Sequence, residues 1–223
     1  MDEIKILYND KDVTVCVKPP LTASQQDSKG SVNMLSLLDD QLGKEHKCVH
    51  RLDFGVGGTM VYASTQKAAS KLSAYVADRS FEKQYLAVVY GSPAESSGVY
   101  KDLLFKDSAK NKSYIVDRIR KGVKEASLEY KVLDTQNTEK GELSLVWIKL
   151  HTGRTYQIRV QFASRKTPLY GDGKYGSKTN EKITALWSRS LSFAHPVTGK
   201  SINMESLPDS VFPWNAFNLE NLL

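Results

Sequence analysis

Residues 47–63 carry the side chains of this sequence best suited to chemistry. The stretch reads K-C-V-H-R-L-D-F-G-V-G-G-T-M-V-Y-A, so His50, Arg51 and Asp53 lie between an apolar run and a glycine-rich turn. We expect Asp53 at a strand end, where the glycines allow a tight turn and the close approach of something flat and bulky. A nucleophilic carboxylate needs such a setting, because it must stay ionised with room for a substrate above it. Taken alone, the same residues also fit a strand, a turn and a solvated ion pair.

A second candidate turn follows another strand-like run. Residues 151–160 read H-T-G-R-T-Y-Q-I-R-V, and Thr155 is placed to cap a helix that turns Ile158 and Phe162 inward. Glycine, arginine and threonine at such a helix start are typical of an anion site, because unpaired N–H groups point outward there. A phosphate- or nucleotide-binding enzyme is therefore one hypothesis, although a glycine-rich phosphate loop with a lysine is absent from the sequence.

The composition is that of a folded, basic protein. With 40% hydrophobic residues among 223, the chain can bury one substantial core, and the lack of repeats or linkers predicts a single domain over residues 1–223. Apolar runs are too short to span a membrane, the N-terminus lacks a signal-peptide pattern, and Cys16 and Cys48 lie in apolar runs as expected of free thiols. These features predict a cytoplasmic location and no membrane partner.

Charge and histidine spacing indicate which binding partners to expect. The net charge of +6 favours a polyanionic binding partner. The four histidines show no ligand spacing with cysteines or carboxylates, which predicts no metal site. The basic residues recur between turns rather than in one tail, and so predict a folded positive surface: Arg118, Arg120, Lys121, Lys124, Arg154, Arg159, Arg165, Lys166, Lys174 and Lys178.

Apolar periodicity predicts the elements that must position these residues. A helix is expected to begin at Ser31 and end at Gly43, and a second helix is expected after a Thr65 cap. Consecutive strands joined by short turns indicate an antiparallel sheet rather than a βαβ array. The expected strands are residues 4–8, 13–17, 81–89, 115–116, 128–133, 143–150, 186–193 and 201–204.

Three segments together resemble one known family. They are His50-Arg51-Leu52-Asp53 with its glycines, K-Q-Y-L-A-V-V-Y-G at residues 83–91, and T-G-R-T-Y-Q-I-R-V at residues 152–160. Their order and spacing are similar to those of RluA-type pseudouridine synthases. Three other stretches also resemble that family: D-K-D-V-T-V-C-V-K-P-P, P-L-Y-G-D-G-K-Y-G and L-W-S-R-S-L-S-F-A-H-P-V-T-G-K. The similarity covers about residues 6–204.

The resemblance implies a fold and an activity. The fold is α+β, with a mixed, largely antiparallel central sheet, flanking helices and a catalytic cleft across the sheet. The activity is isomerisation of a specific uridine in transfer or ribosomal RNA to pseudouridine, without cofactor or metal. Asp53 would be the catalytic carboxylate, Tyr85 would lie against the extruded base, Arg159 would pair with Asp53, and Arg51 would replace the uridine in the RNA stack. Further RNA contacts are expected from His50, Arg154, Thr155 and Gln157.

Simpler interpretations of these residues stay open at this point. Tyr85 also fits a core strand residue, Arg159 an exposed helix arginine, and Arg51 a surface ion-pair partner.

The sequence also departs from the family pattern. Val56-Gly57-Gly58 stands in place of Thr-Ser-Gly, Tyr156 and Gln161 replace two histidines, and Leu186-Trp187-Ser188 replaces Leu-His-Ala. These changes leave the choice of substrate open and support an alternative, a diverged RNA-binding protein that has lost turnover. The family's small N-terminal RNA-binding module is not seen before Ile4, so we expect the catalytic domain itself to recognise a structured stem-loop. We also expect a monomer.

Overall fold

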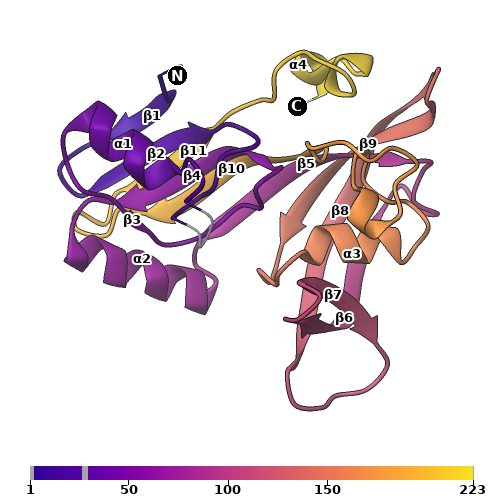
Figure 1. The fold of residues 1–223 in the computed structure, drawn as a ribbon, viewed down its shortest axis with the longest axis horizontal. Coiled ribbons are helices and arrows are strands. Elements are labelled where there is room, and N and C mark those ends of the chain that lie inside the picture. The colour runs from indigo at the N-terminus through magenta and orange to yellow at the C-terminus, as the bar shows by residue number, and fades with distance from the viewer. Residues whose placement is uncertain (1–2, 27–29, 223) are drawn as a thin grey trace. The chain divides into compact units, whose positions relative to one another are not determined.

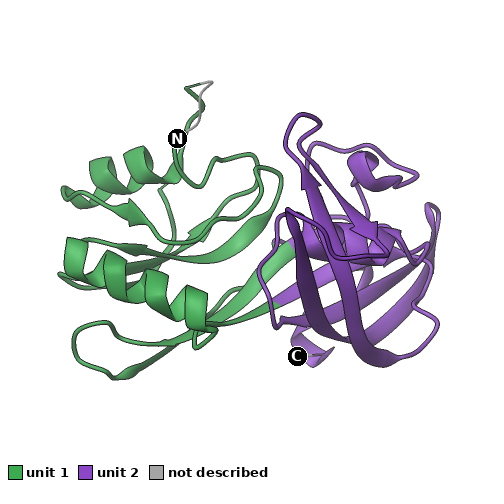
Figure 2. Ribbon diagram, turned by 90° about the horizontal axis from the view of Figure 1, so that it is seen from below, with its two compact units in different colours: residues 1–84, 187–208 green, residues 85–186, 209–223 purple. Residues whose placement is uncertain are grey.

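A computed structural model describes residues 3–26 and 30–222, and the chain divides into two compact units. Unit 1 contains residues 1–84 and 187–208, and unit 2 contains residues 85–186 and 209–223 (Figure 2). The strands β5 (Glu82–Tyr90) and β10 (Leu186–Ala194) both pass from one unit into the other. Because neither unit is one continuous stretch, the boundary does not separate successive domains. The single domain predicted over residues 1–223 stays a prediction.

Unit 1 is built on a mixed sheet (Figure 1). Its strands are β1 (Ile6–Asn9), β2 (Val13–Lys18), β3 (Lys47–Cys48), β4 (Gly57–Ala63), the greater part of β10, and β11 (Ser201–Glu205). β2 pairs with β1 and β4, β3 pairs with β4, and β11 pairs with β10, all antiparallel. A parallel pairing joins β4 to β10 at Gly57–Trp187 and Gly58–Ser188, directly after the Asp53 turn.

Two capped helices belong to unit 1. In α2 (Gln66–Asp78), the hydroxyl of Thr65 accepts a hydrogen bond from the backbone N–H of Ala68 at 3.2 Å, which confirms the predicted cap. α1 (Met34–Leu42) is capped by Asn33, whose side-chain oxygen accepts from two backbone N–H groups, so the predicted start at Ser31 is wrong. The predicted end is confirmed, since Gly43 closes α1 with a left-handed φ of 64°.

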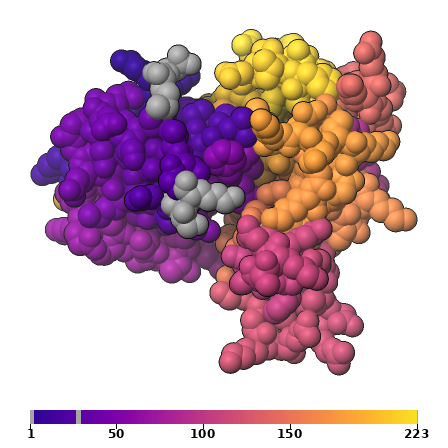
Figure 3. Space-filling view, in the orientation of Figure 1, coloured from indigo at the N-terminus to yellow at the C-terminus, as the bar shows by residue number. Residues whose placement is uncertain are grey.

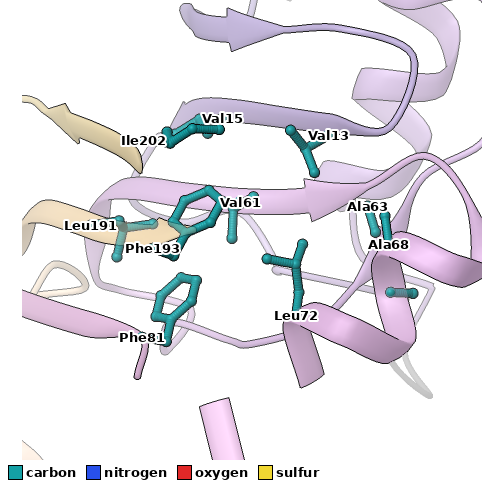
Figure 4. Close-up of a cluster of buried hydrophobic side chains, with 11 residues drawn as sticks. Val13, Val15, Val61, Ala63, Ala68, Leu72, Phe81, Leu191, Phe193 and Ile202 are labelled. Carbon is teal, nitrogen blue, oxygen red and sulfur yellow. The ribbon is translucent and has the colours of Figure 1, made fainter. Parts of the chain in front are cut away.

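The core of unit 1 lies between the sheet and α2. Val13 and Val15 of β2 lie two positions apart and so share one face of the sheet. Val61 of β4 and Leu72 of α2 pack with them in the same cluster (Figure 4). The rings of Phe81 and Phe193 stack with centroids 5.1 Å apart. This apolar layer fixes β4, the strand that follows the Asp53 turn.

Unit 2 contains a second group of strands. They are the greater part of β5, with β6 (Ser97–Asp107), β7 (Lys112–Val116), β8 (Val123–Thr138) and β9 (Gly141–Leu150), in the order β5-β9-β8-β6-β7. The β6–β7, β6–β8 and β8–β9 pairs are antiparallel. The sheet in both units therefore confirms the predicted mixed, largely antiparallel architecture; β6 is a strand that the sequence prediction missed.

Short helices complete unit 2. They are α3 (Gln157–Ala163), η1 (Gly173–Tyr175), η2 (Trp214–Ala216) and α4 (Leu219–Leu222). α3 packs on β6 and β7 through Val160, which is buried with Leu104 and Ala126. The predicted Thr155 cap is wrong: the residue before α3 is Tyr156, in a left-handed conformation with φ of 58°, and its side chain makes no capping hydrogen bond.

The predicted basic surface includes one exposed loop of unit 2. Residues 117–122, between β7 and β8, are all exposed and include Arg118, Arg120 and Lys121 (Figure 3, magenta to pink). The guanidinium of Arg120 lies 5.1 Å from the ring centroid of Phe105, so an apolar strand face supports this cation.

Candidate active site

The predicted site residues are divided between the two units. Asp53 belongs to unit 1 with Arg51 and His50, whereas Tyr85 and Arg159 belong to unit 2. The predicted pairing of Arg159 with Asp53 joins residues of different units and stays a prediction. Each half of the site has a well-defined local geometry of its own.

The Asp53 turn ends against β10. The backbone N–H of Val56 donates to the carbonyl of Asp53 at 3.0 Å, which closes the turn before β4 begins at Gly57. A Cβ on Gly57 would lie 2.4 Å from the indole of Trp187, and a Cβ on Gly58 would lie 2.3 Å from the carbonyl of Ser188. The flat, bulky group that these glycines admit is therefore an indole of the same unit, together with the backbone of β10.

A buried lysine holds this turn from within unit 1. Lys18 is fully buried, and its ammonium donates to the carbonyls of Pro19, Thr22 and Phe54 at 3.0, 2.7 and 3.4 Å. Burial lowers the pKa of Lys18 to about 7, and the nearby charge of Asp53 opposes that fall. One cation therefore ties residues 19–22 to the residue after Asp53.

Ser24 also joins the segment after β2 to the segment that leads into Asp53. The hydroxyl of Ser24 donates to the carbonyl of Leu52 at 2.9 Å and accepts from the N–H of Leu52 at 3.0 Å. The phenol of Tyr62 donates to the carbonyl of Ser24 at 3.0 Å. Because all these groups are buried, the backbone that leads into Asp53 has little freedom.

Arg51 and His50 differ sharply in exposure. Arg51 is exposed, as expected of an RNA contact. His50 is buried, and its Nε2 accepts a hydrogen bond from the backbone N–H of Val61 at 3.1 Å. Burial, with a smaller contribution from the charge of Lys83, holds the pKa of His50 well below its ordinary value, so the imidazole is neutral. These contacts give His50 a structural role, and its predicted contact with RNA stays a prediction.

In unit 2, Arg159 is held by a carboxylate that sequence reasoning did not single out. Its Nε and Nη2 donate to the two oxygens of Asp172, each at 2.7 Å, and Asp172 is 1% exposed. The guanidinium also lies 4.8 Å from the ring centroid of Tyr156 and 5.3 Å from that of Tyr175. A bidentate pair between two aromatic rings fixes the plane of the guanidinium. The signal was the loop P-L-Y-G-D-G-K-Y-G, which contains both Asp172 and Tyr175.

Tyr85 is a buried residue of β5, 6% exposed, in a run of buried positions. Burial of this kind fits a core tyrosine as well as a residue that becomes covered by a base. Its predicted contact with the extruded uracil stays a prediction.

The remaining predicted RNA contacts shape the turn before α3. Gln157 is buried, and its side-chain oxygen accepts from the hydroxyl of Thr152 at 2.7 Å and the N–H of Arg154 at 3.0 Å. Its amide donates to the carbonyl of Ser127 at 3.1 Å. Arg154 donates through Nε to the carbonyl of Glu125 at 2.9 Å.

Ser113 donates through its hydroxyl to the carbonyl of Thr155 at 2.7 Å. These bonds position the backbone of the turn. The predicted RNA contacts of Arg154, Thr155 and Gln157 stay predictions.

Among residues 3–26 and 30–222, one group has the composition of a metal site: Asp10, Asp12 and His195. Nδ1 of His195 accepts from the N–H groups of Val197 and Thr198, so the ring proton is on Nε2, which donates to Asp10 at 2.9 Å. Neither ring nitrogen then offers a lone pair to an ion. The geometry fits a structural link between β1 and the turn before β11 better than a metal centre. In the described part of the chain, the helices are too short or too polar to cross a bilayer.

The chain is similar to known proteins over most of its length. A family model described as RNA pseudouridylate synthase matches residues 12–164. A protein of Aquifex aeolicus named "Uncharacterized RNA pseudouridine synthase" is 34% identical over 95% of this chain and 72% of its own. "Ribosomal large subunit pseudouridine synthase C" of Rickettsia bellii is 30% identical over 93% of this chain and 69% of its own. Among solved structures, "Human RNA Pseudouridylate Synthase Domain Containing 1" has the same fold, with a TM-score of 0.81, 21% identity and coverage of 98% and 92% of the two chains.

Proposed function

Because this chain belongs to the RluA-type RNA pseudouridine synthases, which are isomerases, we propose that it converts one specific uridine of a transfer or ribosomal RNA to pseudouridine through Asp53. The matched residues 12–164 include Asp53, Tyr85 and Arg159, together with every predicted RNA contact. The observation that carries the proposal is the Asp53 turn itself, a carboxylate on a backbone fixed by Lys18 and by the Gly57–Gly58 contact with β10.

The reaction sets clear demands on the residues. The nitrogen–carbon glycosidic bond must break, the detached uracil must turn, and a carbon–carbon bond must form, so the base has to leave the RNA stack and stay bound. We assign the ionised carboxylate of Asp53 to this chemistry, as nucleophile at the sugar or the ring, or as a base at the sugar. Tyr85 would present an aromatic face to the uracil and a phenol for the final proton removal.

Arg159 would favour the ionised form of Asp53 by its opposite charge. The pair with Asp172 supports this role, because it presents a guanidinium whose plane is already set. Arg51, which is exposed, would enter the RNA stack in place of the extruded base.

We also propose how the RNA is recognised, the oligomeric state of the enzyme and its cellular location. RNA recognition would use a structured stem-loop, the enzyme would act as a monomer without cofactor or metal, and it would work in the cytoplasm. Cys16 and Cys48 are free thiols, as expected in a reducing compartment, which supports the last point.

The test is a chemical map of pseudouridine in RNA from cells that lack the protein. RNA incubated with the wild-type chain should gain pseudouridine at one position or a small set of positions. RNA incubated with Asp53→Asn should gain none, while its affinity for the enzyme should change by no more than a few-fold. Asp40→Asn, on the exposed face of α1, is the matched control and should act as the wild type does.

The outcomes separate the enzyme from its alternative. Normal turnover by Asp53→Asn would refute the assignment of Asp53. Tight RNA binding by the wild-type chain, with no modified position in any RNA, would favour the non-catalytic RNA-binding protein. Tight binding of a free nucleotide that RNA cannot displace would favour the nucleotide-binding hypothesis at residues 151–155.

A further inference from the structure

Two large apolar side chains are exposed beside the Asp53 turn of unit 1. Phe54, the residue after Asp53, is 50% exposed, and Leu21 is 37% exposed. The backbone N–H of Leu21 donates to the carbonyl of Phe54 at 2.8 Å, so the two residues are neighbours although 33 positions separate them in the chain. Isolated exposed apolar residues are ordinary; an adjacent pair next to the proposed catalytic carboxylate is not explained by folding.

The backbone that carries this pair is fixed rather than loose. The ammonium of Lys18 donates to the carbonyl of Phe54 itself and to that of Thr22, the residue after Leu21. Leu21 has a left-handed φ of 62°, a conformation that leucine rarely adopts. Strain of this kind persists only where surrounding contacts hold it, and it gathers at functional sites. The backbone of Leu21 is therefore held in an unfavourable conformation that fixes Leu21 and Phe54 relative to each other.

The chemistry of the neighbours selects an RNA base as the occupant. Unpaired bases stack on aromatic rings, and single-stranded RNA combines such stacking with contacts from cations to phosphates. Arg51, also exposed, supplies a cation three positions before Phe54 in the chain. Arg51 would fill the position that the extruded uridine vacates, and a flanking base that also leaves the stack needs a second flat surface. A rigid phenyl ring next to the catalytic residue matches that need.

We propose that Phe54, backed by Leu21, stacks on an unpaired base that flanks the target uridine, and so helps to select the RNA. This rests on the proposed function, since it takes Asp53 as the residue that acts on the uridine. Phe54 is then a specificity residue of the Asp53 turn. The phenylalanine ring would distinguish a purine from a pyrimidine by stacking area, without reading a hydrogen-bond pattern.

The experiment compares three substitutions of Phe54 in the full chain, with RNA that contains the mapped uridine. Phe54→Ala should weaken RNA binding by about 5- to 150-fold, the range measured when a base-stacking aromatic is removed. Phe54→Trp should retain wild-type affinity, because it keeps a stacking face. Phe54→Leu should bind poorly, because it keeps apolar area without an aromatic face. In steady-state assays, the loss for Phe54→Ala should fall mainly on KM rather than on kcat.

Phe212→Ala is the matched control, because Phe212 is 42% exposed and lies outside the Asp53 turn. It should bind RNA as the wild type does. The contacted base is identified with RNAs that lack one base on either side of the target. An abasic position that is contacted should weaken the wild type but not Phe54→Ala, so the two changes should not be additive.

Each outcome has a distinct meaning. Equal binding by Phe54→Ala and the wild type would overturn the inference, and so would full affinity of Phe54→Leu, which would indicate an apolar contact such as a protein partner. Additive losses from Phe54→Ala and every abasic position would also overturn it. If the wild-type chain formed no pseudouridine in any RNA, the proposed function would fail. Asp53-dependent modification with unaltered Phe54→Ala binding would overturn only the stacking role.

Discussion

Lys18 gives this protein a stability that should depend on pH. The lysine is fully buried, and burial lowers its pKa from 10.5 to about 7 in the folded chain. Between these two values the unfolded chain binds the proton and the folded chain releases it, so the free energy of unfolding should increase as pH rises. The whole difference corresponds to about 5 kcal/mol, and the part gained between pH 6 and pH 9 is about 2 to 3 kcal/mol.

These magnitudes are upper bounds, because the three carbonyls that accept from Lys18 also favour the ammonium. Lys83, whose pKa burial lowers to about 8, acts in the same direction and must be separated from Lys18. The assay is therefore urea unfolding at several pH values for the wild type and for Lys18→Met. This substitution removes the titration of Lys18 and leaves that of Lys83. The two curves of stability against pH should diverge, with the wild type gaining relative to the variant as pH rises.

Parallel curves would refute the reasoning, whatever the absolute stability of the variant. That separation matters because Lys18→Met also leaves three carbonyls without their donor, a cost that does not depend on pH. Lys18→Arg serves as a second comparison, since its guanidinium stays charged throughout the range.

Three further measurements test other parts of the structure. Asp172→Asn removes the buried carboxylate that accepts two hydrogen bonds from Arg159, so the free energy of unfolding should fall by about 3 to 5 kcal/mol in urea, and unchanged stability would contradict the buried pair. Gly58→Ala should destabilise strongly, because Gly58 has a φ of 120° and its Cβ would meet the backbone of Ser188, whereas Gly43→Ala at an open position should cost only about 1 kcal/mol. The association constant for RNA should fall steeply with added salt, and binding indifferent to salt would argue against phosphate contacts.

The local features of the fold were accessible from sequence. The Thr65 cap, the Gly43 helix end and most strands follow from propensity and periodicity within short windows. β6 was missed because its sequence, S-G-V-Y-K-D-L-L-F-K-D, mixes charged and apolar residues without clear alternation. The error at Ser31 arose because Asn33, two residues on, is an equally good cap and lies closer to the helix.

The less accessible features depend on contacts between distant residues. The parallel pairing of β4 with β10 joins Gly58 to Ser188, and no local pattern indicates such a partner. A buried lysine such as Lys18 is also contrary to ordinary composition rules, since its burial becomes favourable only where several carbonyls converge. Asp172 could be identified in the sequence as part of a family motif. Its pairing with Arg159 could not, because it depends on how the chain turns between residues 159 and 172.

The interleaved order of the two units has a consequence for synthesis on the ribosome. The greater part of unit 2, residues 85–186, emerges as one continuous stretch. In unit 1, by contrast, β4 pairs with β10, and β10 with β11, only after residues 187–208 have emerged. Gly57 and Gly58 then face an absent neighbour until Trp187 and Ser188 have left the exit tunnel. The Asp53 turn therefore lacks its β10 neighbour until Trp187 and Ser188 have been translated.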